Sequence, residues 1–186
     1  VKDMLRQASD AAKQLITLSD QTIIGILKET AQVLRTHTEE VLAANRQDLE
    51  RMDPANPKYD RLKLTEERLQ GIAADMENVS TLPSPLNKVL SETIRPNGMV
   101  IRKVTVPFGV IGVIYEARPN VTFDVFSLCF RSGNVCVLKG GSDADFSNRA
   151  LVRIIHSVLE RQGINPAVCT LLPPDREATA ELLGAV

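Results

Sequence analysis

Four consecutive residues, Lys139, Gly140, Gly141 and Ser142, stand between an apolar run and a helical pattern. Glycines let the backbone approach a ligand closely, and a helix N-terminus offers free N–H groups to an anion. With the lysine adding a positive charge, the segment suits the phosphate of a nucleotide or of a 2′-phosphorylated ribose. A glycine turn beside a lysine whose ammonium reaches solvent explains the same four residues equally well.

A second polar stretch, residues 115–122, also lies between two apolar elements. Arg118 could clamp a carboxylate or a phosphate with its fork of donors. Asn120 could donate a hydrogen bond to a developing oxyanion. The residue types alone favour a simpler interpretation, in which Asn120 caps the next helix and Arg118 is solvated.

The other chemistry-bearing residue types give no site. Cys129, Cys136 and Cys169 are scattered among apolar neighbours, which predicts buried structural thiols and no nucleophile. No cluster of His, Cys and carboxylates has metal-ligand spacing, so no metal site is expected. The dinucleotide fingerprint G-x-G-x-x-G is absent, and Gly109 to Gly112 hold only half of it at the start of a strand.

The elements that must position these loops alternate in the second half of the chain. Apolar runs at residues 110–115, 135–138 and 168–172 predict strands, and helical patterns at 121–132, at 145–161 and after Asp175 predict helices. This alternation predicts an α/β fold with a parallel sheet. In such sheets ligands bind beyond the carboxyl ends of the strands, where both polar loops lie.

The first half of the chain reads as helices. Ser19 and Thr65 are suited to cap two of them, and Thr36 with Glu39 has the spacing of a capping box for another. Proline-rich breaks separate the helices.

A hairpin is predicted between the two halves. Residues 90–94 and 99–106 carry β-branched residues around Asn97-Gly98, a dipeptide that suits the positive φ angles of a tight hairpin turn. An isolated hairpin is marginal in water, so it must pack on another domain or subunit.

Bulk properties limit the function classes. The 186 residues are 44% hydrophobic and 24% charged with a net charge of −1, as in an ordinary globular protein without a field to attract nucleic acid or an anionic membrane. No window approaches the roughly 20 apolar residues that span a bilayer. The free cysteines and the absence of a secretion pattern predict a cytoplasmic protein.

The motifs resemble one family over essentially the whole chain. Residues 106–122 are similar to the signature stretch of γ-glutamyl phosphate reductases, members of the aldehyde dehydrogenase superfamily. The segments with the same resemblance are residues 43–49, 60–65, 127–129, 132–134, 138–141 and 174–176.

The resemblance implies an aldehyde-dehydrogenase-like, Rossmann-like parallel sheet preceded by N-terminal helices and a β-hairpin arm. Residues 1–88 would be the helical part of the cofactor domain, 89–106 the oligomerisation arm of a homo-oligomer, and 107–186 a truncated NADPH-binding α/β part.

The resemblance also implies a reaction in proline biosynthesis. NADPH reduces L-glutamyl 5-phosphate to L-glutamate 5-semialdehyde and phosphate, after a cysteine thiolate attacks the acyl phosphate. That cysteine belongs to a domain expected beyond Val186, so the chain alone is expected to be inactive. Glutamate 5-kinase is a candidate partner. The alternative is a non-catalytic nucleotide-binding and oligomerisation module.

Residue by residue, the resemblance places Lys139 at the adenosine ribose. Ser142 stands where many NAD-preferring relatives have a glutamate, which would repel a 2′-phosphate, so NADPH is favoured. Asn120 lies two places later than the superfamily's oxyanion asparagine, and Arg118 could hold the phosphate of glutamyl phosphate.

Overall fold

The computed structural model describes residues 1–185, which form helices around a three-stranded sheet and a separate two-stranded hairpin. The helices are α1 (Lys2–Leu15), α2 (Asp20–Thr36), α3 (Thr38–Leu49), α4 (Tyr59–Leu62), α5 (Glu66–Thr81), α6 (Asn120–Arg131), α7 (Asp145–Arg161) and α8 (Arg176–Leu183), with 3₁₀ turns at Ser142–Ala144 and Pro166–Val168. The strands are β1 (Val89–Ile94), β2 (Val100–Val104), β3 (Val110–Ile114), β4 (Val135–Lys139) and β5 (Cys169–Leu171).

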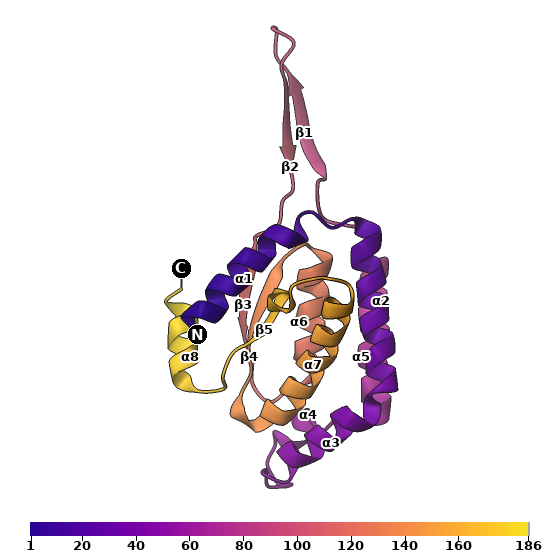
Figure 1. The fold of residues 1–186 in the computed structure, drawn as a ribbon, viewed down its shortest axis with the longest axis vertical. Coiled ribbons are helices and arrows are strands. Elements are labelled where there is room, and N and C mark those ends of the chain that lie inside the picture. The colour runs from indigo at the N-terminus through magenta and orange to yellow at the C-terminus, as the bar shows by residue number, and fades with distance from the viewer. Residues whose placement is uncertain (186) are drawn as a thin grey trace.

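The larger sheet is parallel, with the strand order β3-β4-β5, as the alternation of strands and helices predicts. β4 is buried at all five positions because it has a neighbour on each side, whereas every second residue of the edge strand β3 is exposed. Helices α6 and α7 pack on the sheet from one side and α1 from the other, with α2 and α5 forming an outer layer on α6 and α7 (Figure 1).

Two of the three helix starts predicted in the first half of the chain are confirmed. The hydroxyls of Ser19 and Thr65 accept the backbone N–H groups of Thr22 and Arg68, which caps α2 and α5. The expected capping box at Thr36 is wrong. Thr36 is the last residue of α2 and its hydroxyl donates to the carbonyl of Val33, so it stabilises a helix end instead of a start.

The hairpin is confirmed, but its turn differs from the expected one. The Gly98 N–H donates to the carbonyl of Arg95, and the N–H of Arg95 to the carbonyl of Met99, which closes a three-residue loop. Gly98 alone in this loop has a positive φ, 82°, because the loop is a turn followed by one left-handed residue. All residues of β1 and β2 are exposed, and the hairpin projects from the body (Figure 1).

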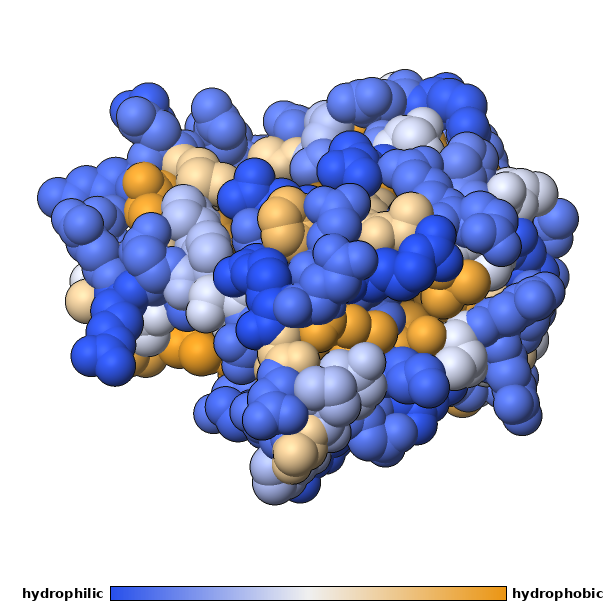
Figure 2. Space-filling view, turned by 90° about the horizontal axis from the view of Figure 1, so that it is seen from below, coloured by the Kyte–Doolittle hydropathy of each residue, from blue (hydrophilic) through white to orange (hydrophobic). Residues whose placement is uncertain are grey.

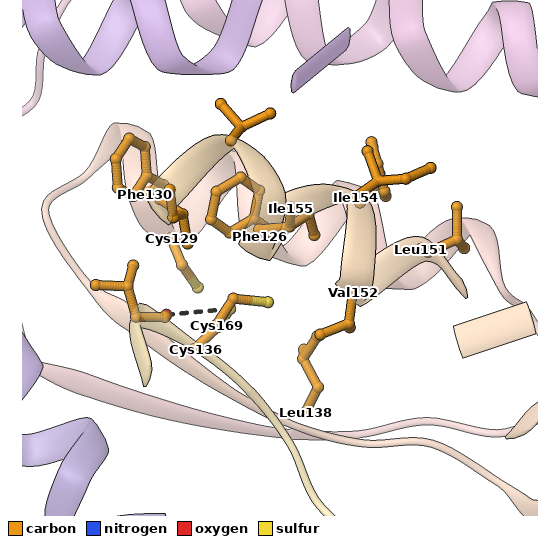
Figure 3. Packing of buried hydrophobic residues seen from close by; sticks show 14 of the residues in the cluster. Phe126, Cys129, Phe130, Cys136, Leu138, Leu151, Val152, Ile154, Ile155 and Cys169 are labelled. Carbon is orange, nitrogen blue, oxygen red and sulfur yellow. Dashed lines mark hydrogen bonds between the residues drawn. The ribbon is translucent and has the colours of Figure 1, made fainter. Parts of the chain in front are cut away.

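The three cysteines are free thiols in the core, as expected. Cys129, Cys136 and Cys169 are buried beside the stacked rings of Phe126 and Phe130, whose centroids lie 5.2 Å apart (Figure 3). The thiol of Cys136 donates a long hydrogen bond to the carbonyl of Val168, at 3.8 Å. These groups therefore behave as small packed side chains.

A buried polar cluster joins the N-terminal helices to the α/β part. The carboxylate of Asp48 accepts the N–H groups of Phe146 and Ser147 at 3.1 and 2.8 Å, and also the Ser147 hydroxyl. The amide of Asn45 donates to the Ser147 hydroxyl and accepts the N–H of Leu64. Residues from α3 thus cap α7. Across residues 1–185, no helix has the length and apolar character needed to cross a membrane.

Candidate functional site

The loops that follow β3, β4 and β5 meet at one end of the sheet. This end also carries α3 and α4 and lies opposite the hairpin, which leaves the body where β3 begins (Figure 1). Seen from this end, most of the surface is hydrophilic, with a band of hydrophobic residues between the polar ones (Figure 2). The ammonium of Lys58, from the segment before α4, lies 3.8 Å from Glu116 and 4.0 Å from Asp143, so it bridges the first two loops.

The first loop opens into a cavity of about 340 Å³. Arg118 and Asn120 line this cavity, so the structure brings together the two residues singled out in this loop. The rest of the lining comes from the α4–α5 region: Asp60, Arg61, Lys63, Leu64, Arg68, Gly71, Ile72 and Asp75. The sequence interpretation missed this wall. The only local sign of this wall in the sequence is the helical spacing of positions 68, 71, 72 and 75, which places these residues on one face of α5.

Asn120 is held by a neighbour on its own helix. It is the first residue of α6, after the N-cap residue Pro119, so the interpretation of Asn120 as a cap is wrong. Its side-chain nitrogen donates to the carboxylate of Asp124 at 3.0 Å, one turn along α6. An amide nitrogen has two N–H donors, so one donor of Asn120 stays available. Burial raises the pKa of Asp124, the hydrogen bond from Asn120 opposes this rise, and the charge of Asp75 adds to it.

Arg118 has an exposed guanidinium. Its backbone N–H donates to the carbonyl of Glu116 at 2.8 Å, which fixes the turn of the loop. Among residues 1–185 its guanidinium forms no ion pair, although it lines the cavity. The solvated state favoured by residue type is therefore observed, and the side chain is in place to bind an anion.

The second loop is held by internal hydrogen bonds. Lys139 is only 8% exposed, and its ammonium donates to the carbonyl of Pro174 in the third loop at 3.0 Å. A lysine that reaches into solvent is therefore wrong for this position. The expectation of free N–H groups at the start of α7 is also wrong for Phe146 and Ser147, because both donate to Asp48.

Gly140 and Gly141 differ in the space around them. A Cβ atom on Gly140 would lie 2.3 Å from the amide nitrogen of Asn148, whereas on Gly141 its nearest neighbour would be 3.5 Å away in Glu116. Any larger residue at Gly140 would therefore force the buried Asn148 side chain to move. Ser142 begins the 3₁₀ turn that leads into α7.

Buried hydrogen bonds connect the two loops. The hydroxyl of Tyr115, at the end of β3, lies 2.7 Å from the hydroxyl of Thr122, which donates to the side-chain carbonyl of Asn148 at 3.1 Å. The same Asn148 side chain faces Gly140. Burial raises the pKa of Tyr115 well above its usual value, so its hydroxyl stays protonated and can donate to Thr122, whose own hydrogen goes to Asn148. This network fixes the start of α6 against the loop after β4.

Thiol and metal chemistry find no support in the described part of the chain. Burial raises the pKa of the Cys129 thiol to about 12, and the contact with Cys169 together with burial raises the pKa of Cys136 well above its usual value. Residues 1–185 contain no group of three or more His, Cys, Asp or Glu side chains arranged to hold a metal ion.

Comparison with known proteins gives consistent relatives, although no family model matches the chain. The γ-glutamyl phosphate reductase of Azobacteroides pseudotrichonymphae is 63% identical over 186 residues, which are 100% of this chain and 44% of that protein. The enzyme of the same name from Bacteroides thetaiotaomicron is 64% identical over 94% of this chain and 42% of its own length. The chain thus spans less than half the length of these curated relatives.

Solved structures show the same relationship. The γ-glutamyl phosphate reductase of Thermotoga maritima superimposes with a TM-score of 0.93 at 32% identity, over 97% of this chain and 45% of that one. An acetylating aldehyde dehydrogenase from Geobacillus thermoglucosidasius, at 17% identity and a TM-score of 0.73 over 98% of this chain and 38% of that one, shares the fold. The resemblance indicated by the motifs is therefore confirmed, and along its whole length this chain is a homologue of the γ-glutamyl phosphate reductases with an aldehyde-dehydrogenase-like fold.

Proposed function

We propose that the protein containing this chain reduces L-glutamyl 5-phosphate to L-glutamate 5-semialdehyde and phosphate with NADPH, a step of proline biosynthesis. The observation that carries the proposal is the match of all 186 residues of this chain, at 63% identity, to 44% of a γ-glutamyl phosphate reductase. Within that reaction this chain supplies the cofactor-binding part and is inactive alone.

The residues of the second loop fit a phosphorylated nucleotide. Lys139 uses one of its three donors on the Pro174 carbonyl, which leaves two for a ribose or a phosphate. Gly141 leaves the backbone accessible, and Ser142 can donate to a 2′-phosphate that an acidic residue would repel. Bound NADPH would supply the hydride, and these residues would hold its adenosine end.

The first loop is suited to the phosphorylated substrate. Arg118 offers an unpaired guanidinium to the phosphoryl group, and Asn120 offers the remaining amide N–H to the oxyanion that forms when the acyl carbon is attacked. The nucleophile must come from outside these residues. A thiol with a pKa of about 12, such as that of Cys129, is protonated at neutral pH, and all three cysteines are buried.

The hairpin supports a homo-oligomer. It exposes large apolar side chains that a monomer would leave in water, and Phe108 at its base is 93% exposed. The exposed apolar residues of β1 and β2 are Val89, Leu90, Ile94, Val100, Ile101 and Val104. Three free thiols fit the reducing cytoplasm, where glutamate 5-kinase would supply the substrate.

The test of the proposal is NADP reduction by the complete gene product, supplied with glutamate semialdehyde, with and without inorganic phosphate. Strict dependence on phosphate is expected, because phosphate must release the acyl group from the enzyme. Turnover that ignores phosphate would indicate an aldehyde dehydrogenase for free aldehydes instead. No turnover at all would favour a nucleotide-binding and oligomerisation module.

Cofactor preference has its own test. Ser142→Glu should shift the preference of the complete protein from NADP toward NAD by placing a negative charge at the 2′-phosphate. Asp143→Glu is the matched control, because it lengthens the neighbouring acidic side chain without changing the net charge. An unchanged preference in Ser142→Glu would place the 2′-phosphate elsewhere.

A further inference from the structure

The cavity of the first loop has charges of both signs on its walls. Arg118 lies on one side, and Arg61, Lys63 and Asp75 come from the α4–α5 side. Between these walls runs the face of α5 that contains Gly71. A ligand in this space would contact positive and negative groups at once.

Some of the cavity's charges are already used inside the chain. The guanidinium of Arg68 donates to the carbonyls of Asp60 and Lys63, both at 2.6 Å, and pairs with the Asp60 carboxylate at 3.0 Å. Arg68 and Asp60 therefore brace the segment between α4 and α5. Their charges are paired with each other.

Four charged side chains lining the cavity remain without a partner. Within residues 1–185, the side chains of Arg61, Lys63, Arg118 and Asp75 form no ion pair and no hydrogen bond. Exposed charges are ordinarily solvated, but here three cations and one carboxylate share one cavity. A ligand that complements them carries more than one anionic group and a single cation.

A second carboxylate, that of Asp124, lies near Asp75 and adds to the negative charge at this side of the cavity. Asp124, which holds Asn120, lies close enough to Asp75 for the charge of Asp75 to raise its pKa. Two carboxylates that repel each other both gain from a cation between or beside them. Asp75 lines the cavity, so it is the one that a ligand can reach.

Gly71 leaves room for the ligand. A Cβ atom built on this residue would meet nothing within 4 Å, so packing does not require glycine there. Glycine in the middle of a helix costs about 1 kcal/mol relative to alanine. The residue keeps open the space between the two charged walls.

We propose that this cavity recognises the α-amino acid end of the substrate. Asp75 binds the α-ammonium group, and the cations Arg61, Lys63 and Arg118 share the α-carboxylate and the phosphoryl group. The inference rests on the proposed function and extends it, because it explains how an amino-acid acyl phosphate is distinguished from one without the amino group.

The experiment compares two aldehydes in the complete gene product. Glutamate semialdehyde carries the α-amino group, and 5-oxopentanoate is the same chain without it. Asp75→Asn should raise the KM for glutamate semialdehyde roughly 10- to 100-fold, because that is the loss of affinity expected when a hydrogen bond to a charged group is removed. The KM for 5-oxopentanoate should not change. Glu66→Gln, an exposed acid at the start of α5 outside the cavity lining, is the control and should change neither KM.

The results separate this inference from the proposed function. If wild-type turnover depends on phosphate but Asp75→Asn leaves the ratio of kcat/KM for the two aldehydes unchanged, the amino subsite is wrong and the reductase stands. If wild-type turnover does not depend on phosphate, the proposed function fails and the subsite fails with it.

A second variant tests the cavity itself. Gly71→Leu should fill the space and raise the KM for both aldehydes, whereas Gly25→Leu, at an exposed glycine of α2 that also has nothing within 4 Å, should raise neither. Both variants are expected to fold, because both glycines are exposed and a Cβ atom on either would meet nothing within 4 Å. An unchanged KM in a folded Gly71→Leu protein would overturn the assignment of the cavity.

Discussion

The loops after β3 and β4 lie next to each other, but their basic side chains are held differently. At the end of β4, Lys139 is buried and bonded to the Pro174 carbonyl, and Gly140, the first residue after β4, lies against Asn148. In the loop after β3, Arg118 is exposed and faces an open cavity with no internal partner. The residues at the end of β4 and just after it are held by an internal hydrogen bond and by packing. In the loop after β3, Arg118 presents a charge that a ligand can neutralise.

This difference suits two kinds of ligand. A nucleotide is recognised largely through a shaped backbone surface, so its loop gains from being fixed before binding. A small anionic substrate is recognised by free charges, so a loop that binds one must leave them unpaired. Hydrogen bonds through Tyr115, Thr122 and Asn148 connect the two loops, and variants of the loops and of the cavity wall test the difference between them.

Gly140→Ala should have the largest effect on stability. Its Cβ atom would lie 2.3 Å from the Asn148 amide, so the buried side chain must move, at a cost of about 1 to 3 kcal/mol in the free energy of unfolding. Urea denaturation measures this cost. Gly141→Ala is the matched control and should be close to neutral, since its nearest neighbour would lie 3.5 Å away. Equal stabilities for the two variants would show that the loop after β4 is not tightly packed at Gly140.

Tyr115→Phe should have an intermediate effect on both loops. It removes the hydroxyl that lies 2.7 Å from Thr122, at an expected cost of about 1 kcal/mol in the free energy of unfolding. Tyr59→Phe, the same change at the other tyrosine, should cost less because no hydrogen bond of the Tyr59 hydroxyl is formed within residues 1–185. A larger loss in Tyr59→Phe would contradict the role of the network.

Gly71→Ala should have the smallest effect, and it should be stabilising. Alanine is the better helix former and has open space here, so the free energy of unfolding should rise by about 0.5 to 1 kcal/mol. Gly25→Ala in α2 should give a similar rise for the same reason. If Gly71→Ala destabilises the protein while Gly25→Ala stabilises it, the wall of the cavity is packed more tightly than these distances indicate.

Local signals in the sequence predict the features that depend on neighbouring residues. The alternation of strands and helices, the hairpin and the caps at Ser19, Thr65 and Asp175 all follow from residues within a few positions of each other. The capping box at Thr36 does not form because α3 follows α2 almost directly. The Thr36 hydroxyl donates to the Val33 carbonyl at the end of α2 and does not cap α3.

Features that depend on distant segments were not predictable in the same way. Lys139 is buried because the loop containing Pro174, 35 residues later, folds over it. The α4–α5 wall of the cavity meets Arg118 only in the folded chain. No spacing in the sequence places Asp48 at the start of α7, 98 residues further on.

The central claim is that Arg118 after β3 binds the phosphorylated substrate and Lys139 at the end of β4 binds the nucleotide. Measuring both ligands in variants of both residues tests it most directly. The KM for phosphate and the KM for NADP would be measured in the complete gene product carrying Arg118→Ala or Lys139→Met. Arg118→Ala should raise the KM for phosphate roughly 10- to 100-fold and leave that for NADP unchanged, and Lys139→Met should do the reverse. Variants that raise both constants together, or that exchange these effects, would contradict the account.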